Sequence, residues 1–91
     1  MARIKILVVH HDLDTLSKIY LALVHRNYKT EASDKVEEIE ERIKRLKPAL
    51  IILGKKEWLS LKDILKMRVI IILEKPFQME VLIRTIEEQV I

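Results

Sequence analysis

The sequence contains no cysteine, one glycine, two prolines and one tryptophan. Without cysteine, the chain can form neither a disulfide framework nor a thiolate site. A 49% share of hydrophobic residues argues against disorder. No apolar run is long enough to span a bilayer, and the four apolar residues that follow Lys5 are too few for the core of a signal peptide. We therefore expect a cytoplasmic protein without a membrane segment.

Charge is abundant in the chain but is not gathered in one place. Its 91 residues include 17 lysine and arginine residues and 14 aspartate and glutamate residues, for a net charge of +3. Because the two signs are interleaved, we expect a solvated surface, and the pattern does not favour a nucleic-acid partner. The charged residues, beside one asparagine and two glutamines, are typical of a thermophile protein. The length predicts one domain over residues 1–91.

Apolar segments of strand length alternate with amphipathic segments of helix length along the chain. The predicted strands cover residues 4–9, 28–32, 49–53 and 69–73. The last two are apolar on both faces, as buried strands of a parallel sheet are. Apolar stripes at helical spacing follow each strand, and Asp34 with Glu37 predicts a capping box before the second helix. Four βα units predict one α/β domain with helices on both faces of a mostly parallel sheet.

Several of these segments resemble the receiver domain of response regulators, the CheY-like family. The matching residues are Lys5–Asp12, Ala32–Asp34, Leu46–Gly54 and Lys75–Phe77. The resemblance implies a flavodoxin-like, three-layer α/β/α sandwich. Receivers have five βα units, whereas this chain has room for four. We therefore expect a shortened domain with about four parallel strands in the order 2-1-3-4 and four helices.

The positions that carry the family's phosphorylation chemistry are altered in this chain. His10 and His11 stand where receivers have two acidic residues that help to hold Mg²⁺, and Gly54 stands where the phosphoryl-accepting aspartate closes the third strand. No serine or threonine lies near Leu73, where the resemblance implies a hydroxyl residue, while Lys75 keeps the family's lysine. Gly54 has no side chain to accept a phosphoryl group, and Mg²⁺ would lose the oxygen ligands that it requires, so we expect neither phosphorylation nor a metal or other cofactor. No pair of a nucleophile and a base is visible in the sequence, so we also expect no catalytic residue and no enzymatic activity.

Two other kinds of binding at the strand ends are compatible with the residues. His10 and His11 could bind a transition metal. However, neighbours at a strand end are expected to point in opposite directions, which disfavours a shared ion. Lys75 could hold an anion together with backbone N–H groups, or it could pair weakly with an acidic neighbour.

The segment after Gly54 offers further candidate contacts. Lys55 and Lys56 beside Trp58 would suit a weak nucleic-acid binder. Trp58 could instead fill the space of the missing βα unit, or it could lie in a protein interface, where tryptophan is enriched. The sequence leaves these alternatives open.

The predicted strand at residues 69–73 is expected to lie at a sheet edge, where unpaired backbone groups favour self-association. We therefore expect an interface that contains Trp58, Val69, Ile71 and Leu73 in a homodimer or larger oligomer. The leading interpretation is a stand-alone, phosphorylation-independent pseudo-receiver. It would act as a protein-interaction module in two-component signalling, with an unknown protein partner. The alternatives are a sensor of a small anion or ligand at the strand ends, or a weak nucleic-acid binder.

Overall fold

The computed structural model describes residues 4–63, 65, 69–74 and 77–89. Strands and helices alternate over these residues, as the sequence pattern predicts. In chain order they are β1 (Lys5–Val9), α1 (Leu13–His25), β2 (Lys29–Ser33), the 3₁₀ turn η1 (Val36–Glu38), α2 (Ile39–Leu46), β3 (Leu50–Gly54), α3 (Lys55–Leu61), β4 (Val69–Leu73) and α4 (Met79–Gln89). Among these described helices, none has both the length and the apolar character needed to cross a bilayer.

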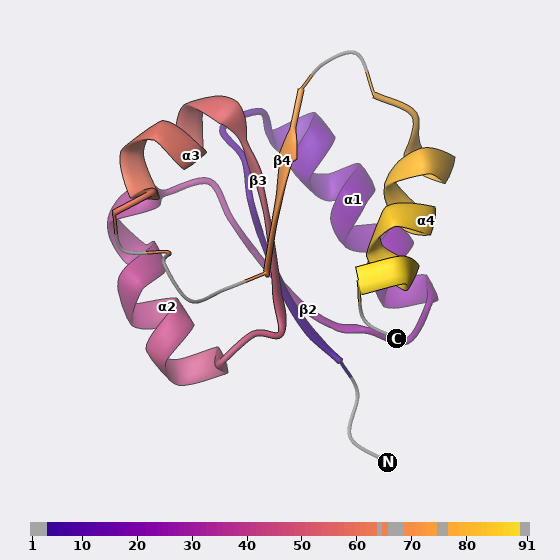
Figure 1. The fold of residues 1–91 in the computed structure, drawn as a ribbon, viewed down its shortest axis with the longest axis horizontal. Coiled ribbons are helices and arrows are strands. Elements are labelled where there is room, and N and C mark those ends of the chain that lie inside the picture. Colours follow the sequence, from indigo (N-terminus) through magenta and orange to yellow (C-terminus); the bar gives the residue numbers. More distant parts are fainter. Residues whose placement is uncertain (1–3, 64, 66–68, 75–76, 90–91) are drawn as a thin grey trace.

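The described strands form one parallel sheet in the order β2-β1-β3-β4, which confirms the predicted topology. Figure 1 shows α2 and α3 on one face of this sheet and α1 and α4 on the other. The chain leaves β1 toward one edge and returns to form β3 on the other side of β1. In an open α/β sheet such a reversal of direction opens a crevice at the carboxyl ends of the two central strands.

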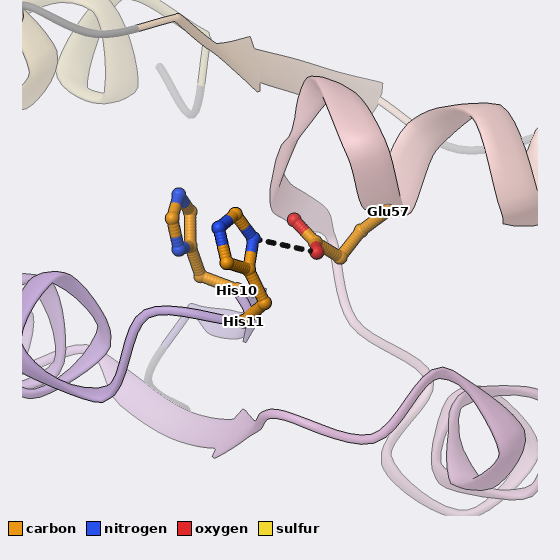
Figure 2. Close-up of side chains that lie close together, drawn as sticks. All are labelled: His10, His11 and Glu57. Carbon is orange, nitrogen blue, oxygen red and sulfur yellow. Dashed lines mark hydrogen bonds and ion pairs between the residues drawn. The ribbon is translucent and has the colours of Figure 1, made fainter.

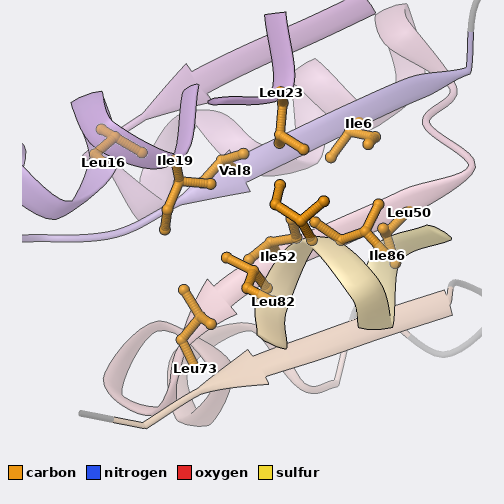
Figure 3. Packing of buried hydrophobic residues seen from close by; sticks show 11 residues of the cluster. Ile6, Val8, Leu16, Ile19, Leu23, Leu50, Ile52, Leu73, Leu82 and Ile86 are labelled. Atoms are coloured by element: carbon orange, nitrogen blue, oxygen red, sulfur yellow. The ribbon is translucent and has the colours of Figure 1, made fainter. Parts of the chain in front are cut away.

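The two central strands of the sheet are buried on both faces, and their side chains alternate between two hydrophobic clusters. Ile6 and Val8 of β1 face α1 and α4, where they pack with the apolar residues of Figure 3. Leu7 and Val9 face α2 and α3. Every residue of β3 is buried, which accounts for a strand without a polar side chain. This packing fixes the strand ends on which the candidate site is built.

The start of the second helix differs from the prediction. The chain enters through η1, and the cap residue Lys35 makes no side-chain capping bond, so the expected capping box of Asp34 and Glu37 does not form. The hydroxyl of Ser33 instead accepts a hydrogen bond from the Lys35 N–H, at 3.1 Å. Ser33 thereby satisfies a backbone donor that a capping side chain would otherwise take up, because serine readily forms such local turns.

Candidate functional site at the carboxyl ends of β1 and β3

A pocket of about 400 Å³ lies at the carboxyl ends of the central strands. It is lined by residues that follow β1, residues at the junction of β3 and α3, and the end of β4. The lining residues are His10, His11, Gly54, Lys55, Lys56, Leu73 and Glu74. The structure thus brings together His10, His11 and Gly54, which the sequence assigned to one degenerate site. Lys75, the fourth residue of that set and the candidate anion ligand, lies outside the described residues.

Gly54 is needed for space rather than for an unusual backbone conformation. Its φ of −71° and ψ of 162° are open to any residue. A Cβ atom at this position, however, would overlap Oε1 of Glu57 and would lie 3.0 and 3.1 Å from Cδ2 and Nε2 of His10. Gly54 pairs with Leu73 at the end of the sheet. The position therefore has no room for a side chain while Glu57 and His10 stand where they do.

Glu57 is the functional candidate that the sequence interpretation missed. It lies in the first turn of α3, and only 3% of its surface is exposed. Its Oε2 accepts a hydrogen bond from Nδ1 of His11 at 3.0 Å (Figure 2). Its Oε1 is buried without a hydrogen-bond partner in the part of the chain that the structure describes. Its position could have been inferred from the spacing in the sequence. A helix that begins directly after Gly54 brings the residue three positions later back beside the end of the strand.

The imidazole rings of His10 and His11 lie against each other. Their centroids are 4.7 Å apart and the rings are 19° from parallel, so they form a stack. The expectation that the two side chains point in opposite directions is therefore wrong. The alternation on which it rests applies within a strand, whereas β1 ends at Val9 and both histidines belong to the following turn.

The two histidines differ in exposure and in hydrogen bonding. His10 is 3% exposed, and its Nδ1 accepts a hydrogen bond from the backbone N–H of Asp12 at 3.0 Å. The His11 side chain is 55% exposed and reaches Glu57. A nitrogen atom from each ring and a carboxylate oxygen of Glu57 all lie within 4.8 Å of one another. The result is a compact cluster of two imidazoles and one carboxylate.

Asp12, which directly follows the two histidines, caps the N-terminus of α1. Its carboxylate accepts hydrogen bonds from the Asp14 N–H at 3.2 Å and from the Thr15 hydroxyl at 2.7 Å. Such caps stabilise a helix by satisfying backbone donors of its first turn. The carboxylate nearest to the histidines in sequence is thus bonded to the helix.

The lysines at the pocket are exposed. Nζ of Lys55 lies 3.8 Å from a carboxylate oxygen of Glu74, and both side chains are about two-thirds exposed. A pair of this kind contributes little to stability. The prediction of an anion or ligand site at the strand ends stays a prediction.

The residues expected at an interface lie in different surroundings. Trp58 is half-buried against the cluster that faces α2 and α3, Ile71 is half-buried against the opposite cluster, and Leu73 belongs to the core at 7% exposure. Val69 forms part of β4, but its side chain lies outside the description. Ile72, which the sequence interpretation did not single out, is 41% exposed on this strand.

A second cleft, of about 420 Å³, lies between β4 and α4. Apolar side chains in its lining include Ile71, Ile72, Phe77 and Val81. Val81 is 53% exposed, so the cleft opens between two exposed aliphatic residues. We call this cleft, with the exposed Ile72 and Val81 beside it, the β4–α4 face.

The four parallel strands and the helices on both faces define a flavodoxin-like α/β domain. No family model matches the sequence, and no curated protein matches it. Among solved structures, that of the chemotaxis response regulator CheY4 of Vibrio cholerae matches with a TM-score of 0.73 and 14% sequence identity. The match covers 98% of this chain and 100% of the CheY4 chain. The chain therefore has a CheY-like receiver fold, as its sequence predicts.

Proposed function

We propose that this protein is a pseudo-receiver, a signalling domain that binds protein partners without being phosphorylated. The observation that carries the proposal is the position of Glu57 against Gly54. Gly54 ends the third strand of a receiver-like sheet and offers no side chain to a phosphoryl group, and the space beside it is filled by the buried carboxylate of Glu57.

The surroundings of Gly54 support the same proposal. His10 and His11 present nitrogen atoms at the end of β1, whereas Mg²⁺ is held by oxygen ligands. The Glu57 carboxylate is buried and already accepts a hydrogen bond from His11. The pocket thus lacks an exposed carboxylate at the end of β3 to serve as phosphoryl acceptor.

The β4–α4 face is the surface that we propose for docking, with a second copy of this chain as its partner. Within the described sheet, β4 pairs with β3 on one side only, so the other edge of its backbone is open to a further strand. The exposed Ile72 and Val81 flank an apolar cleft beside this edge. Pairing of β4 with β4 of a second copy about a twofold axis would cover both the backbone edge and the cleft.

The direct test of phosphorylation independence is incubation with acetyl phosphate and Mg²⁺ followed by intact-mass measurement. We expect the mass of the unmodified chain. A phosphoryl adduct that is stoichiometric and requires Mg²⁺ would overturn the proposal. A receiver domain with an intact acceptor aspartate, treated in the same tube, is the positive control for the phosphodonor.

A further inference from the structure

The cluster of His10, His11 and Glu57 contains a buried polar atom that the described residues leave unsatisfied. The described residues provide no hydrogen-bond partner for Oε1 of Glu57, although the carboxylate is almost wholly buried. A buried acceptor without a partner costs free energy, and a buried carboxylate costs more than a neutral group. A buried atom of this kind calls for a partner beyond the described residues, such as another residue of the chain, a water molecule or an ion.

We propose that His10, His11 and Glu57 form a binding site for a divalent transition metal ion of the zinc, nickel and cobalt class. Two imidazoles and one carboxylate are ligands that these ions accept, whereas Mg²⁺ and Ca²⁺ select oxygen ligands alone. The site goes beyond the docking function proposed above, because none of its atoms is needed for a partner to bind the β4–α4 face.

The three donors are close enough together to reach one ion once the histidine rings turn. Zinc lies about 2.0–2.2 Å from histidine nitrogen and carboxylate oxygen, so two ligands of a tetrahedral ion stand roughly 3.3–3.5 Å apart. The Nδ1 of His11 and Oε2 of Glu57 are 3.0 Å apart, and the full set of three donors lies within 4.8 Å. Because the two rings are stacked, their nitrogen lone pairs run nearly parallel, so at least one ring must turn before both can point at one ion.

His10 is the ligand that must change most. The Asp12 N–H donates to its Nδ1, so a neutral His10 ring carries its proton on Nε2. To coordinate an ion, this ring must either turn about its Cβ–Cγ bond or move its proton from Nε2 to Nδ1, and either change breaks the hydrogen bond from the Asp12 N–H. The loss of one such bond is small beside the affinity of three side chains for a transition metal.

Three protein ligands leave at least one coordination position open, as in zinc sites that also bind water or a small molecule. The pocket of about 400 Å³ that His10 and His11 line gives access to that position. The ion would also join the turn after β1 to the first turn of α3. Metal binding should therefore stabilise the folded chain by mass action.

The test uses the full chain without an affinity tag, after removal of metals with a chelator. Thermal unfolding is followed by circular dichroism with Zn²⁺, Ni²⁺, Co²⁺ or Mg²⁺ chloride in excess, and Co²⁺ binding is followed by its visible absorption. The variants are Glu57→Gln, which keeps the shape of the side chain, and His11→Ala, which changes an exposed residue and is therefore expected to fold. His25→Ala, at the exposed end of α1, is the control.

We expect Zn²⁺, Ni²⁺ and Co²⁺ to raise the Tm of the wild-type chain and of His25→Ala, and Mg²⁺ to leave it unchanged. Each site variant should bind more than about tenfold more weakly, since loss of even an outer-shell partner costs that much. An unchanged wild-type Tm with excess metal would overturn the proposal. So would wild-type binding by Glu57→Gln and His11→Ala. Neither outcome would affect the phosphorylation test, so the two proposals fail separately.

Discussion

Oε1 of Glu57 occupies the space that a side chain on Gly54 would require. The two residues are three positions apart, and the first turn of α3 brings the glutamate back over the end of β3. A carboxyl group is thus present at this strand end, but it is buried and bonded to His11 rather than exposed to a phosphodonor. The relationship explains why the position is a glycine and supplies the first test of the site.

The Gly54→Ala substitution should lower the free energy of unfolding by about 1–3 kcal/mol, the usual cost of overpacking a filled site. The backbone conformation at Gly54 suits alanine, so without the overlap the change would be expected to stabilise by about 0.4–1 kcal/mol. In a Glu57→Ala background most of the cost should therefore disappear, because only the close contacts with His10 remain. Urea unfolding of the four chains measures this double-mutant cycle. Equal effects of Gly54→Ala in both backgrounds would show that Glu57 does not fill the space.

The Glu57→Met substitution should raise the metal-free free energy of unfolding by about 1–2 kcal/mol, because it replaces a buried carboxylate, whose Oε1 has no partner among the described residues, with an apolar side chain of similar size. His11 would lose its bond to Glu57 but is exposed enough to be hydrated. Glu57→Gln is the matched control: it removes the charge but keeps polar atoms to satisfy, so its gain should be smaller than that of Glu57→Met. Chemical denaturation in the presence of chelator measures both. A less stable Glu57→Met chain would mean that the carboxylate stabilises the fold without metal.

The overall fold could be predicted from the sequence because its signals are strong and mutually consistent. The apolar run of β3 predicts a central strand from its composition alone, and the structure confirms this, since every residue of β3 is buried. Strand order followed from the resemblance and from the number of βα units. Local capping was less predictable, because Ser33 and Asp34 are both able to cap and the choice between them depends on where β2 ends.

The candidate site was only partly predictable. The sequence predicted that Gly54 and the two histidines lie at the same edge of the sheet, because each of them comes at the end of a predicted strand. The directions of the histidine side chains did not, because β1 ends one residue before His10 and the alternation of strand side chains stops there. Glu57 was missed because a single glutamate in a short helix is expected to be exposed on the surface. Its burial depends on the space left by Gly54, which is a tertiary property.

The Ile72→Lys substitution should weaken self-association by introducing a charge into the centre of the proposed β4–α4 contact. Ile72 is already 41% exposed in the single chain, so the folded subunit should tolerate lysine with little change in Tm. Leu21→Lys is the control, because Leu21 is 56% exposed on α1, which packs next to the opposite sheet edge. Light scattering after size-exclusion chromatography should give a monomer for Ile72→Lys and a dimer for Leu21→Lys. A dimer in both cases would place the contact elsewhere.

The central claim is that this receiver-like domain docks without phosphorylation. It is tested most directly by measuring the molar mass of the wild-type chain by light scattering at micromolar concentration, with and without acetyl phosphate and Mg²⁺. The account predicts a dimer of the same mass in both samples, because Gly54 offers no acceptor whose phosphorylation could change the β4–α4 face. A monomer in both samples, or a mass that changes with the phosphodonor, would contradict it.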